Sequence, residues 1–459
     1  MGSAKWLPAA ATVASAALLY FGTGLSPIPL LAWLFPLPLL LVAKKVSGWA
    51  AAGAGFAAGF AGSTNFWYWS AQSHDLPLWP WGVVIATAFG VTFALAVTVF
   101  RLLPPAFGVL AAPAAWVTPL YLAAALNPMG IEGTLVTSEV EVPVVMQATS
   151  ALGPWGVEFL IFFIPTAVAT WRPRIALVAA AVAALVVGGG VLRLTADPGP
   201  SQRVALLASN QKGWATDLDT AAGRTLLADY VQQLYALPEG VDMVVLPEAA
   251  FASAREWPSE LTELMRRIAT GRALTIVVGF QHVSPTAKYN YALSFPNGAR
   301  YLKHHDAVSP LGTELVFAEP GRVGMTICFD VNFRSPSADY AVAGARMLAF
   351  PASDEDHNGW RHSRTALLRG VENGMAIAWS GRKTTLMLSD GYGRVIASKP
   401  TGPGTDGFTT VIGDVPLGPG ATLYSRFGDW FAWLCLAVTA LALVKAFARK
   451  KDRPAADHG

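Results

Sequence analysis

Three side chains in the polar part of this 459-residue chain have the chemistry of a thiol enzyme. Glu248, Lys303 and Cys328 each lie at the end of a strand-like run, or within a few residues of it. A carboxylate can take a proton from a thiol and return it to a leaving group. An ammonium group favours the thiolate and stabilises the oxyanion that forms when sulfur attacks a carbonyl. We therefore predict that Cys328 is a nucleophile, with Glu248 as its base and Lys303 as its cation.

These residues belong to a segment in which short β-rich stretches alternate with helix-length amphipathic stretches. Such alternation predicts helices that cover a largely buried sheet, with functional side chains just beyond the carboxyl ends of strands. The predicted strands are 204–209, 243–246, 274–280, 289–294, 300–302, 323–327, 347–350 and 376–380. A further hairpin is expected around 390–393. The predicted helices are 218–237, 261–269, 335–343 and 361–373.

The rest of the chain is unusually apolar, since 53% of all residues are hydrophobic and only 14% are charged. Soluble domains carry about 25% charged residues, so part of this protein is predicted to lie in lipid. Eight apolar stretches approach the ~20 residues that a membrane-spanning helix needs. They are 6–22, 26–43, 48–69, 78–100, 104–125, 153–171, 175–192 and 428–447.

Basic residues set the predicted orientation of these spans. Lys and Arg occur in alternate loops and in the tail after residue 448, whereas the intervening loops contain none. Both termini are therefore expected in the cytoplasm. The predicted domains are a seven-helix transmembrane domain at 1–194, an extracytoplasmic catalytic domain at 195–425, an eighth transmembrane helix at 426–448 and a cytoplasmic basic tail at 449–459.

The residue pattern disfavours several other classes of function. Cys328 and Cys435 lie in such different settings that they predict no disulfide framework. The chain has no basic stripe with interleaved aromatic residues, which argues against nucleic-acid binding. The histidines and acids near the predicted site lack metal-ligand spacing, so we expect solvated loop residues, no metal and no cofactor. These residues are His304, His305, His357, His362, Asp354 and Asp356.

Several short motifs follow one another in the order found in a known superfamily. Glu248 and Lys303 precede these motifs in the chain. Taken together, these residues make segment 203–413 resemble the nitrilase, or carbon–nitrogen hydrolase, superfamily. The resemblance implies an α-β-β-α sandwich and a Glu-Lys-Cys catalytic triad. The motifs are Ile327-Cys328-Phe329-Asp330, Phe350-Pro351-Ala352, Val371-Glu372-Asn373-Gly374 and Asp390-Gly391-Tyr392-Gly393.

A nitrilase-like domain placed before the last of eight spans resembles the apolipoprotein N-acyltransferases. Trp214 after the first strand, segment 153–156 at the start of the sixth span and segment 360–362 at the start of a helix also match that family. The resemblance implies an enzyme of the bacterial inner membrane whose catalytic domain faces the periplasm. Such an enzyme takes an acyl chain from a phospholipid as a thioester, here on Cys328. It then passes the chain to the N-terminal amine of a diacylglyceryl-cysteine on a prolipoprotein, the last step of lipoprotein maturation.

The chain also departs from the acyltransferase pattern around its site. The second glutamate that follows the lysine in that family has its counterpart here in Glu314, at a longer spacing. Asp330 stands where a glutamate is usual, and segment 353–357 replaces an Asn-Asp-x-Trp-Phe element. The resemblance makes Glu314, Asp330, Phe329 and Trp214 supporting residues of the site. Two alternatives remain open: a membrane-tethered nitrilase-like amidase that acts on a small amide, and a non-enzymatic relic that binds lipid or lipoprotein.

Overall fold

The computed structural model describes residues 6–66, 77–210, 213–354, 359–402 and 407–451. The chain divides into two compact units, one made of Met1–Leu192 with Phe427–Gly459 and the other of Arg193–Arg426. The second unit contains Glu248, Lys303 and Cys328, so its strands and helices position the candidate site.

Two β-sheets form the centre of the Arg193–Arg426 unit. The first has the strand order β14-β1-β3-β5-β4-β2, with β6 paired to β5 and β7 paired to β6; the second has the order β13-β12-β11-β10-β9-β8. The first sheet consists of β1 Ser201–Ser209, β2 Thr216–Asp217, β3 Met243–Val245, β4 Phe251–Ser253, β5 Thr275–Val283, β6 Lys288–Phe295, β7 Arg300–Leu302 and β14 Phe408–Pro416. The second sheet consists of β8 Phe317–Glu319, β9 Val323–Met325, β10 Met347–Ser353, β11 Ala376–Arg382, β12 Thr385–Ser389 and β13 Val395–Pro400.

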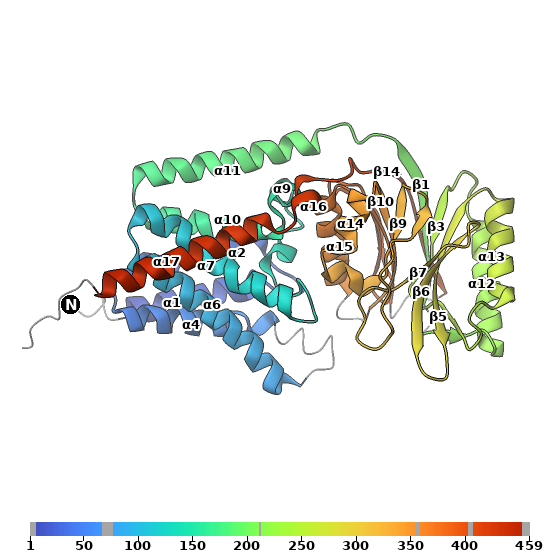
Figure 1. The fold of residues 1–459 in the computed structure, drawn as a ribbon, viewed down its shortest axis with the longest axis horizontal. Helices are drawn as coiled ribbons and strands as arrows, with labels where there is room; N and C mark the ends of the chain where they lie inside the picture. Colours follow the sequence, from blue (N-terminus) through green and yellow to red (C-terminus); the bar gives the residue numbers. More distant parts are fainter. Residues whose placement is uncertain (1–5, 67–76, 211–212, 355–358, 403–406, 452–459) are drawn as a thin grey trace, which may run out of the picture. The chain divides into compact units, whose positions relative to one another are not determined.

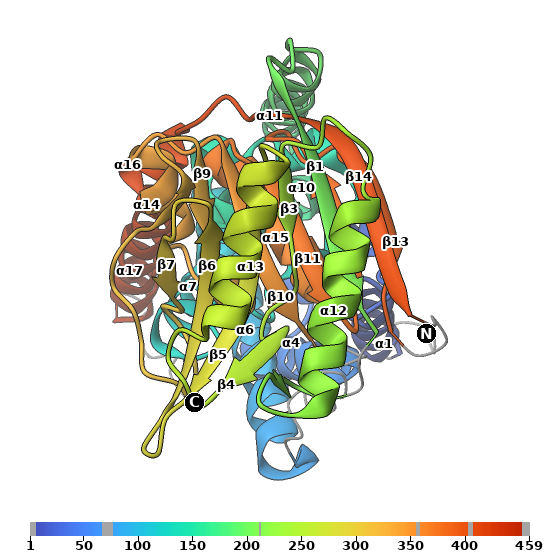
Figure 2. The same cartoon turned by 90° about the vertical axis from the view of Figure 1, so that its right-hand side faces the viewer.

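Helices cover the outer face of each sheet. α12 (Ala221–Ala236) and α13 (Ser259–Gly271) lie on the first sheet, and α14 (Ser337–Val342) and α15 (Gly359–Asn373) lie on the second (Figure 1). Figure 2 shows α12 and α13 lying side by side across the strands of the first sheet. This arrangement is the α-β-β-α sandwich that the sequence implies.

Strand β1 shows how the two hydrophobic cores form, because successive side chains of a strand point to opposite faces of its sheet. Val204 and Leu206 are buried in a core that contains residues of both sheets. Ala205 and Leu207 are buried in a second core, to which α12 and α13 contribute. Complete burial of a leucine-sized side chain contributes about 1.5–3 kcal/mol, so this alternation fixes which face of β1 meets the helices.

The strands and helices predicted between residues 204 and 380 are all present, with ends that differ by a few residues. The hairpin expected around 390–393 is formed by β12 and β13. Strands β2, β4, β8 and β14 were not predicted. The first three have only two or three residues each.

Apolar helices make up most of the described part of the other unit. Its helices are α1 Leu7–Phe21, α2 Pro29–Leu34, α3 Leu37–Ala43, α4 Gly48–Gly62, η2 Leu78–Gly82, α6 Val83–Leu102, α7 Pro105–Leu126, η3 Leu135–Ser138, α8 Pro143–Met146, α9 Thr149–Leu152, α10 Pro154–Ala169, α11 Pro173–Leu194 and α17 Trp430–Lys451.

Four helices are long and apolar enough to cross a membrane, judged by length and composition within the described residues. A fifth span results if the two helices that meet at a 119° bend, Pro143–Leu152 and Pro154–Ala169, are counted as one. An apolar helix overlaps each of the eight predicted spans, but several, such as Leu7–Phe21, are shorter than a full span. The multi-span topology and its orientation therefore stay predictions. The four long helices are Trp79–Leu102, Pro105–Leu126, Pro173–Leu194 and Trp430–Ala448.

Candidate active site

A buried ion pair joins two of the three predicted catalytic residues. Lys303 Nζ lies 2.8 Å from Glu248 Oε1, and the two side chains are only 8% and 1% exposed. Asn290 Nδ2 also donates a hydrogen bond to Glu248 Oε1, at 2.7 Å. The backbone N–H of Glu248 donates to Ala352 O of β10, at 3.2 Å. This last bond ties the loop that carries Glu248, in the first sheet, to the second sheet.

The backbone around Glu248 depends on one glycine in the neighbouring strand. A Cβ added to Gly279 of β5 would meet Pro247 O at 2.1 Å and Glu248 Cα at 2.6 Å. The next residue, Ala249, has a φ of +46°, a left-handed conformation that costs a residue other than glycine roughly 1–3 kcal/mol. The close approach and the strained turn together bring the carboxylate of Glu248 to Lys303.

A second carboxylate, which the sequence did not reveal, also contacts Lys303. Asp306 Oδ2 lies 3.4 Å from Lys303 Nζ. Burial would lower the pKa of Lys303, but Glu248, Cys328 and Asp306 outweigh burial and raise it. Lys303 is therefore a permanent ammonium. Glu314, the counterpart of the second glutamate by the resemblance, is exposed, and its backbone carbonyl lies 3.1 Å from His304 Nε2.

Cys328 begins a short 3-10 helix, η4 (Cys328–Asn332), shortly after β9 ends. Its φ of +32° lies in the left-handed region, and such strain persists only where the surroundings hold it. Hydrogen bonds to the carboxylate of Asp330 stabilise much of this turn. Asp330 Oδ2 accepts hydrogen bonds from Ile327 N at 2.9 Å and from the Tyr301 hydroxyl at 2.7 Å. Its Oδ1 accepts from the backbone N–H groups of residues 304 and 305, at 3.1 and 2.8 Å.

Through these hydrogen bonds Asp330 links the loop that carries Lys303 to the turn that carries Cys328. Asp330→Asn would turn an NH₂ group toward N–H and O–H donors, so we expect a loss of about 1.5–3 kcal/mol in unfolding free energy. We also expect Cys328 to be acylated more slowly by about tenfold or more, because small misplacements of reacting groups have large effects on rate. Thermal unfolding of the full chain and acylation by a small activated ester measure the two effects. Asp414→Asn, at an exposed position of β14, is the matched control; equal behaviour of the two variants would contradict this role for Asp330.

The thiol of Cys328 is 4% exposed and contacts the end of β10. Sγ lies 3.5 Å from Ser353 O and 3.7 Å from Asp354 Oδ1. Within the described residues, no hydrogen bond joins Sγ to Glu248 or Lys303. Burial raises the pKa of Cys328 well above its usual range, the carboxylates of Asp354 and Glu248 raise it further, and Lys303 offsets part of the rise. These surroundings favour the neutral thiol of Cys328 over its thiolate.

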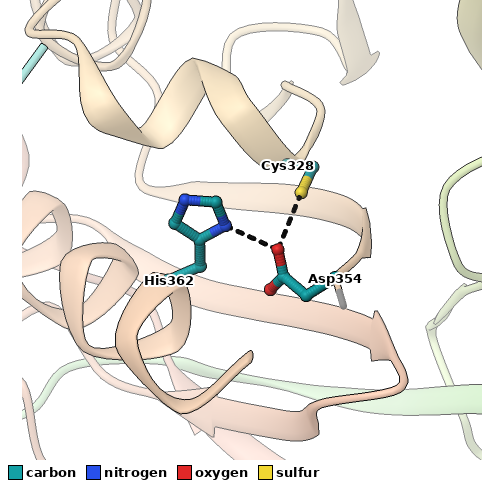
Figure 3. Close-up of side chains that lie close together, drawn as sticks. All are labelled: Cys328, Asp354 and His362. Carbon is teal, nitrogen blue, oxygen red and sulfur yellow. Dashed lines mark hydrogen bonds and ion pairs between the residues drawn. The ribbon is translucent and has the colours of Figure 1, made fainter. Parts of the chain in front are cut away.

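His362 completes a cluster with Cys328 and Asp354 (Figure 3). His362 Nδ1 lies 2.6 Å from Asp354 Oδ1, and each of the three residues offers a ligand atom within 4.8 Å of the others. The expectation that Asp354 and His362 are solvated loop residues is wrong, because both are buried. His357 and Asp356 lie outside the described residues.

The two aromatic residues that the resemblance assigned to the site have different surroundings. The ring of Phe329 meets the rings of Phe333 and His362 edge-on, with centroids 5.6 and 6.3 Å apart. Trp214 is 45% exposed, and its ring lies 5.7 Å from the guanidinium of Arg382. Arg382 also donates hydrogen bonds to Ser353 Oγ, so Trp214 is connected to the residue whose carbonyl contacts the thiol.

This geometry agrees with comparisons of the sequence with known families. The family model described as carbon–nitrogen hydrolase matches residues 203–418. These residues form a carbon–nitrogen hydrolase domain. The prediction of a nitrilase-superfamily domain is thereby confirmed, and the matched range includes Glu248, Lys303, Cys328, Asp354 and His362.

Three curated relatives each match part of the chain. An apolipoprotein N-acyltransferase of Geobacter metallireducens is 26% identical over 134 residues, which are 28% of this chain and 25% of the relative. A glutamine-dependent NAD(+) synthetase of Xylella fastidiosa is 28% identical over 194 residues, 34% of this chain and 35% of the relative. A deaminated glutathione amidase of Yersinia enterocolitica is 27% identical over 224 residues, 39% of this chain and 78% of the relative. The matches span only about a quarter to a third of the length of the first two relatives.

Solved structures also resemble part of the chain. Nit3 of Saccharomyces cerevisiae, a member of the nitrilase superfamily, is 18% identical, with a TM-score of 0.39, and the match covers 48% of this chain and 92% of that one. An amidase from Nesterenkonia sp. AN1 is 18% identical with a TM-score of 0.37, and the match covers 51% of this chain and 96% of that one.

Proposed function

We propose that this chain is a membrane-bound acyltransferase that carries an acyl group on Cys328 as a thioester. The observation that carries the proposal is the buried Lys303–Glu248 pair close to a buried, strained thiol in a carbon–nitrogen hydrolase domain. The Lys303 ammonium is suited to stabilise the oxyanion of a tetrahedral intermediate. Glu248 Oε2 is buried with no hydrogen-bond partner among the described residues, so this oxygen is available to exchange a proton.

In the first half-reaction the thiol of Cys328 loses its proton and the sulfur attacks an ester carbonyl. A C–S bond forms, the C–O bond to the leaving alcohol breaks, and the proton passes to that alcohol. In the second half-reaction an amine attacks the thioester, an amide forms and the thiol is regenerated. No metal or cofactor takes part in this scheme.

The apolar helices support a lipid as the acyl donor, since a soluble donor would not require them. We propose a phospholipid donor and the N-terminal amine of a diacylglyceryl-cysteine on a prolipoprotein as acceptor. The similarity to the Geobacter metallireducens acyltransferase supports this choice. In this proposal the protein is integral to the bacterial inner membrane, with the catalytic domain in the periplasm and both termini in the cytoplasm.

An amidase that acts on a small amide is the second candidate. The burial of Cys328, at 4% exposure, suits a small substrate as well as the end of an acyl chain. The names of the Xylella fastidiosa and Yersinia enterocolitica relatives, a glutamine-dependent synthetase and an amidase, support it. In this reading water takes the place of the amine in the second half-reaction.

A labelling experiment on the purified full chain tests the proposal. In mixed micelles with a phospholipid labelled in its acyl chains, we expect a hydroxylamine-labile label on Cys328. A synthetic peptide that begins with diacylglyceryl-cysteine should then remove the label from the protein and carry it as a hydroxylamine-stable amide.

The two cysteines of the chain provide the control. Cys328→Ala should take up no label, while Cys435→Ala should be labelled like the wild type. The proposal fails if the wild-type thiol can be alkylated and yet forms no acyl adduct. Release of ammonia from small amides, with no transfer to the peptide, would instead favour the amidase.

A further inference from the structure

Asp354 and His362 form a hydrogen-bonded pair on the sulfur of Cys328 that the Glu-Lys-Cys triad does not use. Asp354 follows β10 directly, and His362 lies in the first turn of α15. Figure 3 shows the carboxylate of Asp354 between the thiol and the imidazole. Asp354 Oδ1 lies 3.7 Å from Sγ and 2.6 Å from His362 Nδ1, and all three side chains are buried.

The imidazole of His362 is held from both sides. Its second nitrogen, Nε2, lies 3.4 Å from Asn332 Nδ2, and Asn332 belongs to the same short helix as Cys328. The ring therefore bridges the carboxylate after β10 and the turn of the nucleophile. Because Asn332 Nδ2 is a donor, Nε2 is the accepting nitrogen of the ring, and Nδ1 carries the hydrogen that is donated to Asp354 Oδ1.

The two oxygens of Asp354 have different surroundings. Oδ1 contacts the thiol and the imidazole, whereas Oδ2 is buried and accepts no hydrogen bond within the part of the chain that the structure describes. A buried carboxylate oxygen without a donor is costly. Oδ2 therefore offers a place for an N–H or O–H group brought in by a substrate. Glu248 shows the same pattern within the described residues, since Oε1 accepts bonds from Lys303 and Asn290 while Oε2 has no partner.

The second half-reaction requires a group of the protein that first accepts a proton and then donates one. The attacking amine must lose a proton as the amide forms, and the departing sulfur must gain one. We propose that Asp354, held in place by His362, is a second general base and acid, which takes the proton from the acceptor amine and delivers it to the sulfur of Cys328. This inference rests on the acyl transfer proposed above and assigns the chemistry of its second step.

The proton balance closes within the pair. The neutral amine attacks the thioester carbon, and its N–H proton passes to Asp354 Oδ2, while the Nδ1–H of His362 keeps its hydrogen bond to Asp354 Oδ1. The tetrahedral adduct then collapses, the C–S bond breaks, and the sulfur leaves with its bonding electrons. The carboxyl group of Asp354, which contacts Sγ, then gives the proton to the sulfur. Thioester and amine become amide and thiol, and the pair regains its starting state.

The hydrogen bond from His362 Nδ1 fixes the orientation of the Asp354 carboxylate. One of its oxygens contacts Sγ, and the other is left for the acceptor. The contact between Asp354 Oδ1 and Sγ supplies the return path, because it is the contact that the thiol makes at rest.

The test separates the two half-reactions in the full chain. Cys328 is first loaded with an acetyl group from p-nitrophenyl acetate, whose leaving group needs no protonation, and a peptide with a free α-amine is then added. For Asp354→Asn and His362→Asn we expect loading within about fivefold of the wild type and transfer to the amine slower by about 10²-fold or more. With methoxyamine as acceptor the deficit should shrink, because the N–H of its adduct is more acidic and needs the pair less.

Two controls make the result specific. His282→Asn alters a partly buried histidine that stacks on Tyr289, and it should leave both steps unchanged. Glu248→Gln should impair loading itself. An equal loss of both steps in Asp354→Asn and His362→Asn would show a merely structural role and overturn the inference, as would unchanged transfer. The test of this inference uses p-nitrophenyl acetate in place of the lipid donor. Failure of the wild type to accept an acyl chain from phospholipid would therefore overturn the proposed function but not the role of Asp354.

Discussion

Methionine in place of Lys303 should slow the acylation of Cys328 by about 10³-fold, since loss of a single oxyanion donor costs 10²–10³-fold in rate. The ammonium of Lys303 balances two carboxylates, Glu248 at 2.8 Å and Asp306 at 3.4 Å. Without it, one of the two carboxyl groups must take up a proton or remain as an unpaired buried charge. Loading of Cys328 by p-nitrophenyl acetate in a stopped-flow experiment measures the effect directly.

The same variant should move the pH dependence of thiol alkylation to higher pH. In the wild type, burial together with Asp354 and Glu248 raises the pKa of Cys328, and Lys303 lowers it. Removing Lys303 deletes the lowering contribution, so the pKa rises further and less thiolate is present at any pH below it. Asp354→Asn deletes a raising contribution and should shift the profile in the opposite direction. The rate of reaction with iodoacetamide, which follows the thiolate fraction, reports both shifts.

Lys288→Met is the matched control, because this lysine is exposed at the start of β6. Its loading rate and its alkylation profile should equal those of the wild type. If Lys303→Met loads Cys328 within tenfold of the wild-type rate while remaining folded, Lys303 is not the oxyanion donor. A shift of its alkylation profile to lower pH would contradict the electrostatic role given to the lysine.

The sequence predicted the triad because each of its members follows a strand with a visible pattern. The runs before Glu248, Lys303 and Cys328 become β3, β7 and β9. Strands β3 and β7 belong to one sheet and β9 to the other, and the two sheets pack face to face. Period-two patterns and buried apolar runs are local properties, so they can be recognised without knowledge of the partner strands. The α-β-β-α sandwich itself came from the order of motifs along the chain.

Asp306, Asp354 and His362 could not be found in this way. Asp306 lies in a stretch between β7 and β8 that has no regular structure, so no periodic pattern in the sequence shows that its side chain meets Lys303. Asp354 and His362 are separated by a loop, and their contact exists only because β10 and the start of α15 meet at the nucleophile turn. A charged loop residue is usually solvated, which is why the sequence suggested solvated side chains for both.

Arg369 should be the residue outside the triad whose loss is most damaging to the folded domain. This guanidinium, on α15, is buried; its Nε donates to Val331 O at 2.8 Å and its Nη2 to Asn332 O at 3.2 Å. Its Nη1 pairs with Glu372 one turn further along the helix. Arg369→Met leaves a buried carboxylate without this partner, which costs about 3–5 kcal/mol. In a domain of this size we expect the unfolding midpoint to fall by on the order of 10 °C.

A double variant separates the two roles of Arg369. Replacing both members of a buried ion pair by apolar residues is far less costly than removing one, so Arg369→Met with Glu372→Met should recover more than half of the lost stability. The loading rate of Cys328 should not recover, because the bonds that hold Val331 O and Asn332 O, and with them the strained Cys328, are still missing. Arg267→Met, at an exposed position of α13, should change neither quantity. If rate and stability recover together, the guanidinium serves only as a partner for Glu372 and the nucleophile turn is held by Asp330 alone.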